Sequence, residues 1–208
     1  MMINENNNTN NDPNSIIMYG HGCYKLDTKK CCCIDIVEFE ENFNLACNLS
    51  KENPERAIEL YTKVINMYKK SYLSESYEYE WLIPARNYYQ RIYYQSIYML
   101  SDFLREKQQY QEIVKVCQKA LKYEFFEEEI HIRYIEALAA KGKIKQAKDH
   151  YKYVVEMFEQ ELKVKPSEEL ACSYHCLFED TTKKALNIMS ISECFKEANL
   201  IEGPILCN

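Results

Sequence analysis

Glycine is scarce in this sequence: four of the 208 residues are glycine, and they are too few and too scattered to form a phosphate-binding loop. Such loops need closely spaced glycines so that the backbone can approach the phosphates. No serine, histidine and aspartate occur together in a context that supports nucleophilic catalysis. We therefore expect a protein that is not an enzyme, with no catalytic residues and no cofactor.

Long apolar runs and an excess of basic residues are also missing. No window reaches the about 18 to 20 uncharged apolar residues of a membrane-spanning helix, and the N-terminus lacks the basic start and apolar run of a signal peptide. We expect a cytoplasmic protein without membrane contact. The formal net charge of −6 argues against a broad nucleic-acid-binding surface, because phosphate contacts need clustered lysine and arginine.

Cysteine is abundant, with ten residues. The chain is too long and too rich in helix formers for a disulfide scaffold, so reduced thiols are expected. A zinc site from His21, Cys23, Cys31 and Cys33 is conceivable across a hairpin. However, neighbouring strand residues point to opposite faces, and the usual Cys-x2–4-Cys spacing is missing. We interpret these cysteines as small apolar strand residues.

A second group, "CSYHC", places Cys172, His175 and Cys176 on one face of a predicted helix. A packing face is the preferred interpretation, and metal ligation is the alternative. We predict no metal site in either group, and we keep a thiol-based or zinc sensor as the weakest of three functional hypotheses.

The N-terminal segment changes character twice. Residues 1–14 contain seven asparagines and almost no apolar side chains, which predicts a disordered tail. Over residues 15–36, two runs rich in Ile, Tyr and Cys, "SIIMYGHGCYKLD" and "KCCCIDI", flank a polar turn, which predicts a short β-hairpin. From Val37 onward the apolar spacing is close to 3.6 residues, which is typical of helices.

Local signals mark the ends of several helices. Asn53 and Pro54 supply a cap and a first-turn proline, Gly142 a C-terminal stop, and Pro166 with Ser167 another helix start. Pro84 is expected in the first turn of the longest helix. We predict helices over 37–49, 54–70, 79–108, 110–123, 126–141, 143–162 and 165–178, and a further one over 180–200.

An internal repeat relates two of these helices. The segment "QYQEIVKVCQKAL" (109–121) matches "KIKQAKDHYKYVV" (143–155) at an offset of 34, the period of about 34 residues typical of tetratricopeptide repeats. "NPERAIELYTKVI" shows the same pattern at an offset of 56. The matched positions are Leu100 with Tyr134, Leu104 with Leu138, Ile113 with Ala147, Cys117 with Tyr151, and Ala120 with Val154, and from the third segment Ala57, Tyr61 and Val64.

The sequence therefore predicts an all-α fold: a tetratricopeptide-like antiparallel helical array of about seven helices, with a short N-terminal β-hairpin. Each helix pair must stack on its neighbour, because it cannot bury its apolar stripe alone. An unrelated helical bundle is the alternative.

Several motifs in order resemble one known family. They are "IDIVEFEENFNLA", "PERAIELYTKVINMYKKSYL", "YEWLIPARNYYQRIYY" and the stretch from "YQEIVKVCQKALKYEFFEEEIHIRYIEAL" to "KVKPSEEL". Over residues 34–178 the chain resembles the bacterial transcriptional activator domain of antibiotic-regulator-type transcription factors. The resemblance implies a tetratricopeptide-like array directly after a winged helix-turn-helix DNA-binding domain.

The resemblance extends to the ends of the chain. "GCYKL" (22–26) is similar to the last strand of the family's wing, but "MMINENNNTNNDPN" offers no counterpart of the DNA-reading helices. "SECFKEANLIEGPILCN" resembles a linker to a further domain. We therefore expect a fragment with a wing remnant at 15–36, the activator domain at 37–178, and a C-terminal helix and linker at 179–208. DNA contact would then require a missing domain.

In the tetratricopeptide register, one face of two helices would line a partner-binding groove. Its acidic and mixed character suits a basic or amphipathic peptide and not a phosphate backbone. The groove-lining positions are predicted to be Gln95, Tyr98, Asp102, Arg105 and Glu106 in one unit and Glu129, Ile132, Glu136, Ala139 and Ala140 in the next. A tyrosine stripe on the long helix (Tyr88, Tyr89, Tyr93, Tyr94 and Tyr98) is expected to be partly core and partly exposed.

These observations lead to one main functional hypothesis and one alternative. The main hypothesis is a protein-interaction or oligomerisation domain of a bacterial transcriptional regulator. Its partner would be another copy, other regulator domains or the transcription machinery. The alternative is a free-standing tetratricopeptide adaptor that binds a protein or peptide ligand.

Overall fold

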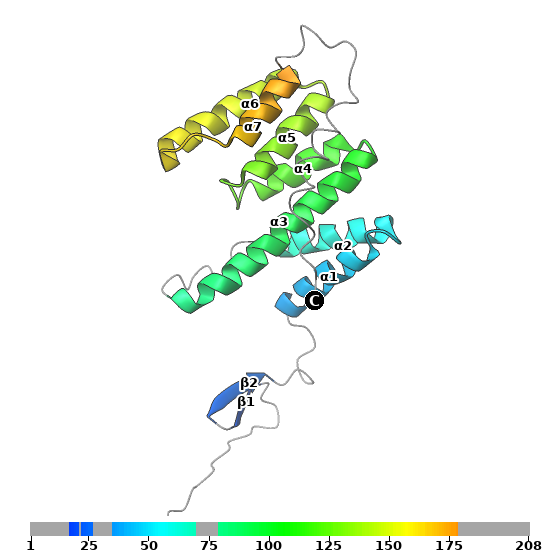
Figure 1. Ribbon diagram of the computed structural model, residues 1–208. Helices are drawn as coiled ribbons and strands as arrows, with labels where there is room; N and C mark the ends of the chain where they lie inside the picture. Colours follow the sequence, from blue (N-terminus) through cyan, green and yellow to red (C-terminus); the bar gives the residue numbers. More distant parts are fainter. Residues whose placement is uncertain (1–16, 21, 27–34, 70–78, 179–208) are drawn as a thin grey trace, which may run out of the picture. The chain divides into compact units, whose positions relative to one another are not determined.

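The computed structural model describes residues 17–20, 22–26, 35–69 and 79–178 (Figure 1). These residues form two compact units, which divide between Met67 and Tyr68. The predicted tail over 1–14, the Cys31–Cys33 run, His21 and the segment 179–208 lie outside the described residues. No helix among the described residues is long and apolar enough to cross a membrane.

The described part of the first unit contains two strands and two helices. Strands β1 (Ile17–Gly20) and β2 (Cys23–Leu26) pair antiparallel, with Ile17 opposite Leu26 and Gly20 opposite Cys23. Gly22, between them, has φ 77°, a left-handed conformation that favours glycine. The longer hairpin predicted over 15–36 stays a prediction, because residues 15–16, 21 and 27–34 are not described.

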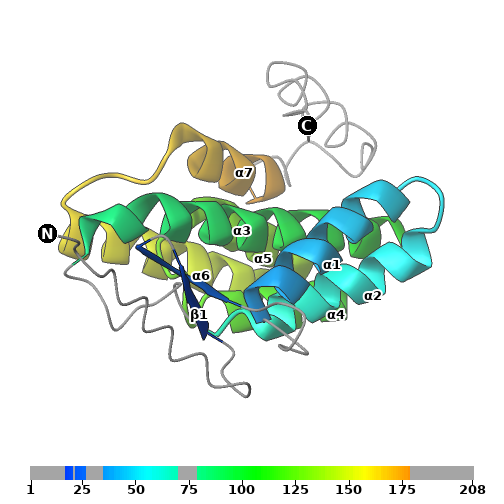
Figure 2. The ribbon, with the colours of Figure 1, turned by 90° about the horizontal axis from the view of Figure 1, so that it is seen from below.

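Helices α1 (Asp35–Leu49) and α2 (Pro54–Met67) pack side by side as a pair (Figures 1 and 2). The predicted cap is confirmed: Asn53 Oδ1 accepts a hydrogen bond from the Arg56 backbone N–H at 3.1 Å. The pair buries one apolar side of each helix, and the Phe43 and Tyr61 rings meet edge to face at 6.3 Å. The buried positions include Phe39, Phe43, Ala46, Ala57, Leu60, Tyr61 and Val64.

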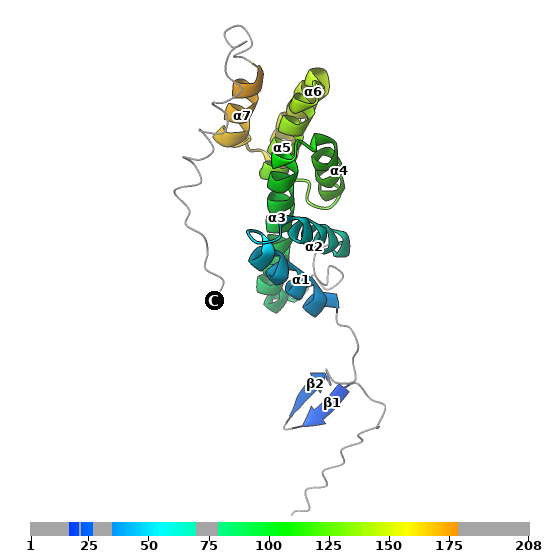
Figure 3. The same ribbon diagram turned by 90° about the vertical axis from the view of Figure 1, so that its right-hand side faces the viewer.

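The described part of the second unit contains five α-helices. A 3-10 turn (Glu80–Leu82) leads into α3, and a π turn (Phe158–Leu162) extends α6. The helices are α3 (Ile83–Glu106), α4 (Tyr110–Ala120), α5 (Glu128–Ala140), α6 (Ile144–Met157) and α7 (Glu168–Phe178). Consecutive helices from α3 to α6 pack on one another, and α7 packs on α5. In Figure 3, α4 and α7 lie on opposite sides of α5.

The 34-residue repeat is confirmed in the backbone. Gln108 (φ 57°) ends the α3–α4 turn and Gly142 (φ 71°) ends the α5–α6 turn, both in the left-handed region. The next residue in each turn donates back across five positions: Gln109 N to Leu104 O at 2.8 Å and Lys143 N to Leu138 O at 2.9 Å. The two connections therefore have the same geometry, as a repeated helix pair requires.

Most of the predicted repeat positions are buried, as a stacked array requires, and Tyr134 and Tyr151 are half-buried. In the second helix of each pair, Ile113, Cys117 and Ala120 are buried, as are Ala147 and Val154, while Tyr151 is half-buried. The segment at an offset of 56 has the same pattern, since Ala57, Tyr61 and Val64 are fully buried. Within the second unit, α3 to α6 thus form a helical-repeat arrangement in which each helix packs on the preceding one.

Several predicted helix ends are corrected. The helix predicted over 54–70 ends at Met67, and the one over 110–123 ends at Ala120. The helix predicted from 126 starts at Glu128, because the backbone of Glu127 is extended, with φ −82° and ψ 103°. The helix predicted over 143–162 is α-helical only from Ile144 to Met157. Pro84 lies in the first turn of α3, as predicted.

Candidate functional site

An arginine on α5 organises the predicted groove. The Arg133 guanidinium donates to Asp102 Oδ1 at 2.5 Å, to Glu129 Oε1 at 2.6 Å and to the Tyr98 carbonyl at 3.2 Å. Its Cζ lies 5.0 Å from the centre of the Tyr98 ring, a cation–π distance. Only 11% of the Arg133 side chain is exposed. The contacts to Tyr98 and Asp102 are contacts with α3, so one side chain ties α5 to α3.

Two further contacts extend this network. Arg105 of α3 pairs with Glu136 of α5 at 2.8 Å, and the Tyr98 hydroxyl donates to Glu127 at 2.7 Å. We call Tyr98, Asp102, Arg105, Glu129, Arg133 and Glu136 the α3/α5 charge network. Charged hydrogen bonds of this kind are stronger than neutral ones, so the network clamps two repeat units together.

The electrostatics of the network keep the arginine charged. Burial by itself lowers the pKa of Arg133, but the carboxylates of Asp102 and Glu129 outweigh it, and the net pKa is raised. The pKa of Glu129 is raised, because burial outweighs the opposing effect of Arg133. The pKa of Glu136 is raised by burial in the same way, against Arg105 and Arg133. Arg105 and Arg133 thus pair with three partly shielded carboxylates, those of Asp102, Glu129 and Glu136.

The predicted groove residues have three different fates. The structure brings Tyr98, Asp102, Arg105, Glu129 and Glu136 together, as the register predicts, while Gln95 lies half-buried one turn before Tyr98. Ile132 is 2% exposed and is part of the core, so its side chain presents no surface to a partner. Sequence reasoning missed Arg133. Its position four residues after Glu129 is the spacing of a helical ion pair and could have revealed it.

A second polar cluster lies along α3. Tyr68, Gln90 and Tyr94 each donate a hydrogen bond of 2.7 Å to the Glu124 carboxylate. Burial and the bond to Glu124 raise the pKa of Tyr68 and of Tyr94. All three donors serve one acceptor, so this cluster anchors the loop after α4 to α3.

The tyrosine stripe divides as predicted into core and surface positions. Tyr93 is fully buried and stacks on Tyr68, with ring centres 3.9 Å apart. Tyr94 and Tyr98 are half-buried and hydrogen-bonded to carboxylates, and Tyr88 is exposed. The stripe therefore mainly holds α3 in the array.

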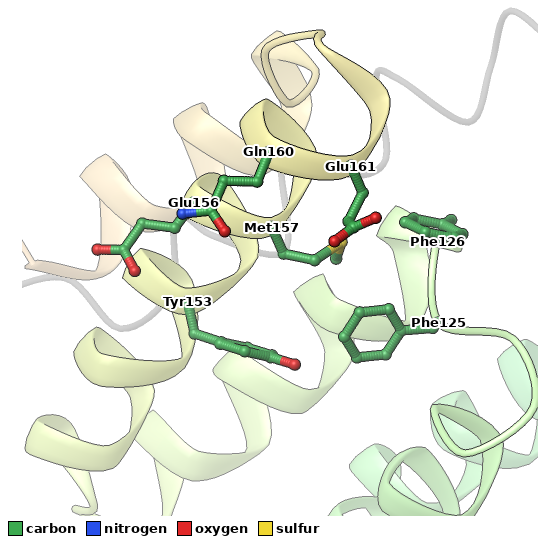
Figure 4. A pocket seen from close by; sticks show the side chains of 7 residues that line it. All are labelled: Phe125, Phe126, Tyr153, Glu156, Met157, Gln160 and Glu161. Atoms are coloured by element: carbon green, nitrogen blue, oxygen red, sulfur yellow. The ribbon is translucent and has the colours of Figure 1, made fainter.

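A cavity of about 370 Å³ opens between the loop before α5 and the end of α6 (Figure 4). We call it the aromatic cavity. Phe125 and Phe126 come from the loop, and the other lining residues come from α6 and its π turn. Its lining consists of Phe125, Phe126, Tyr153, Glu156, Met157, Gln160 and Glu161. Nothing in the sequence pattern singled out this group, because the loop and the π turn are more than 25 residues apart.

The comparison with protein families decides the identity of the helical region. The family model of the bacterial transcriptional activator domain matches residues 34–177. The chain belongs to this family. A search of curated proteins finds no match. The matched residues of the activator domain contain α1 to α6 and all but the last residue of α7, and they include the α3/α5 charge network and the aromatic cavity.

The match confirms the family resemblance inferred from the ordered motifs. The activator domain is a transcription-regulator domain and not an enzyme family. Its helices here carry polar clusters that pair internally, and they present two surfaces with distinct chemistry. One is the α3/α5 charge network and the other is the aromatic cavity.

The cysteines of the activator domain are in different environments. Cys117 is fully buried in α4, and burial raises the pKa of its thiol. Cys172 and Cys176 are exposed on α7, with sulfur atoms 4.0 Å apart, as expected for one helical face. Across the described ranges, no three His, Cys, Asp or Glu side chains are placed to hold a metal ion. Of the residues weighed as a hairpin zinc site, His21, Cys31 and Cys33 lie outside those ranges, and Cys23 is exposed.

Proposed function

We propose that this chain is a protein-interaction domain of a bacterial transcriptional regulator and acts without catalysis. The match of the family model over residues 34–177 carries the proposal. The partner would be another copy of the chain, other domains of a regulator, or the transcription machinery in the cytoplasm. DNA would be reached only through a separate winged-helix reader.

The repeat geometry supports a tetratricopeptide-like array as the interaction scaffold. The two turns that end at Gln108 and Gly142 recur at the tetratricopeptide period and connect helices of similar packing. Strand β2 carries the "CYKL" part of the wing-like motif and pairs with β1. This pairing is compatible with a wing remnant before the activator domain.

The α3/α5 charge network is the surface we assign to the partner. Its inner members pair with one another, so the carboxylates are less available than an unpaired acidic groove would be. The outer members keep substantial exposure: 47% of the Asp102 side chain and 40% of the Arg105 side chain. A partner would form ion pairs or hydrogen bonds with the exposed Asp102 and Arg105, while Arg133 holds α3 and α5 together. Rim charges of this kind tune partner choice and association rate.

Size-exclusion chromatography with light scattering tests self-association. We expect the mass to rise above 24.8 kDa with concentration and to return toward the monomer in Arg105→Glu, which reverses one rim charge. Lys115→Glu, on the exposed side of α4, is the matched control and should behave as wild type. A strict monomer at every concentration would reject self-association and leave contact with other regulator domains.

The free-standing adaptor is the second candidate, because a helical array of this kind needs no DNA-reading domain to bind a peptide. The DNA sequence next to the reading frame distinguishes the regulator from the free-standing adaptor. A helix-turn-helix reader encoded directly upstream, in frame, supports the regulator. A stop codon followed by unrelated genes supports the adaptor.

A further inference from the structure

The aromatic cavity has walls suited to a cation. The Phe125 ring lies 5.7 Å from Phe126 and 5.9 Å from Tyr153, both near perpendicular, so rings from two separate segments surround one space. Phe126 is 48% exposed and Tyr153 is 49% exposed. The faces of aromatic rings are electron-rich and attract ammonium or guanidinium groups. A volume of about 370 Å³ is at the small end of the range of ligand sites.

Two carboxylates complete the lining, and neither has a partner among the described residues. Glu156 and Glu161 form no ion pair or side-chain hydrogen bond there, whereas Asp102, Glu129 and Glu136 in the α3/α5 charge network are all paired. Figure 4 shows the Glu161 carboxylate turned toward the side of Phe126, and Glu156 at the opposite rim. No lysine or arginine lines the cavity. The cavity is therefore anionic and open to a cation.

The π turn explains how Glu161 reaches the cavity. In a regular α-helix each residue rotates by about 100°, so Glu161 would lie about 80° around the axis from Tyr153. The wider turn over Phe158–Leu162 rotates less per residue and brings Glu161 back toward the Tyr153 side. Lys163 ends this turn with φ 57°, and its ammonium donates to the Gln160 carbonyl at 2.7 Å. The backbone thus departs from a regular α-helix at the turn that places the Glu161 carboxylate beside the aromatic rings of the cavity.

We propose that the aromatic cavity binds an arginine side chain carried by an extended basic segment of a partner protein. A guanidinium can stack on Tyr153 or Phe125 while it donates two hydrogen bonds to the Glu161 carboxylate, a combination that suits arginine better than lysine. The inference rests on the proposed interaction function, because it requires a protein partner. It adds a second surface with its own chemistry.

The test uses the whole chain and a short glycine and serine peptide with one arginine. Methyl NMR of Met157 reports on the cavity directly. We expect saturable shifts of the Met157 methyl signal with the arginine peptide at millimolar concentration, and smaller shifts with a lysine peptide. A citrulline peptide has the same shape without the charge, and we expect no response to it. An equal response to citrulline would overturn cation recognition, and an equal response to lysine would overturn the assignment of arginine.

Two variants separate the rings from the charge. Tyr153→Leu keeps an apolar side chain but removes the ring, and Glu161→Gln removes the charge. Each should weaken peptide binding about fivefold to tenfold. Both positions are exposed, so the variants should fold. Glu159→Gln is the matched control, since Glu159 is exposed in the same π turn and does not line the cavity.

The possible results distinguish a failure of the cavity proposal from a failure of the proposed interaction function. Equal weakening by Glu159→Gln would show binding by general charge and overturn the cavity. If the peptide binds without shifting the Met157 methyl signal, and Asp102→Asn abolishes that binding, the peptide occupies the α3/α5 charge network. That result would overturn the cavity as the binding site. No response to any peptide would overturn the cavity, while the test of self-association would be unaffected.

Discussion

The Nδ1 atom of His131 on α5 lies 3.0 Å from the Nε2 atom of His150 on α6, where His131 is buried and His150 half-buried. The Nε2 atom of His131 lies 2.8 Å from the Phe125 carbonyl, which can only accept, so this nitrogen carries a proton. In neutral His131, Nδ1 then accepts from the Nε2–H of His150. The pair is thus held in one tautomeric arrangement, and that arrangement requires His131 to be neutral.

The histidine pair predicts acid destabilisation. Burial, followed by the neighbouring His131, lowers the pKa of His150 to about 4, and burial also lowers the pKa of His131 against the opposing effects of the Phe125 carbonyl and Glu128. The folded state therefore binds fewer protons than the unfolded state as pH falls from about 6.5 to about 4. The stabilisation is complete above pH about 6.5 and is lost across that window, by about 3 kcal/mol for His150.

Urea unfolding between pH 7.5 and 4, measured by circular dichroism, checks this prediction. His150→Gln removes the titrating group and should flatten the pH dependence of the free energy of unfolding. His175→Gln, at an exposed position on α7, is the control and should keep the wild-type slope. An unchanged slope in His150→Gln would contradict the assignment.

Arg133 is expected to be the most costly member of the α3/α5 charge network to remove. Arg133→Met leaves Glu129 and Asp102 without their shared partner, and unfolding should become easier by about 2 to 4 kcal/mol. Arg105→Met, at a more exposed position, should cost less than about 1 kcal/mol. Chemical denaturation at neutral pH compares the two. Adding Glu129→Gln to Arg133→Met should restore part of the loss, and equal losses for the two arginine variants would reject a central role for Arg133.

Glu124 should be sensitive to a change of one atom. Glu124→Gln replaces a carboxylate oxygen with an NH₂ group that points at hydroxyl and amide donors, and the charge is lost as well. We expect a loss of about 2 to 3 kcal/mol in the free energy of unfolding. The conservative change Glu112→Gln, at an exposed position, should cost less than about 0.5 kcal/mol. Similar thermal midpoints for the two variants would show that the three donors find other acceptors.

The two repeat turns allow a paired test of backbone strain. Gly142→Ala meets no atom within 4 Å of the added Cβ, so its cost reflects the left-handed φ alone. We expect a loss of about 1 kcal/mol. Gln108→Gly, at the equivalent position 34 residues earlier, should stabilise the protein by up to about 1 kcal/mol, because glutamine is strained at φ 57°. Shifts of the same sign in thermal unfolding would refute the equivalence of the two turns.

Local sequence was sufficient for the elements of the fold. The cap at Asn53, the proline at the start of α3 and the glycine at the α5–α6 turn act through the backbone within a few residues, so their effects can be predicted without the rest of the chain. Periodicity extended this prediction to the 34-residue repeat, and ordered motifs identified the family. The pairing within the α3/α5 charge network depends on contacts between residues about 30 positions apart, which no local pattern specifies.

The amino-acid sequence by itself determined which segments are helices, how two of them repeat and to which family the chain belongs, because those properties depend on spacing and short-range chemistry. Only the tertiary structure decided that Ile132 belongs to the core, that Arg133 pairs with Asp102 and Glu129, that His131 and His150 are joined by a hydrogen bond, and that a π turn places Glu161 beside three aromatic rings. Each of these depends on the angle at which one helix packs on another, and that angle is set by the whole core.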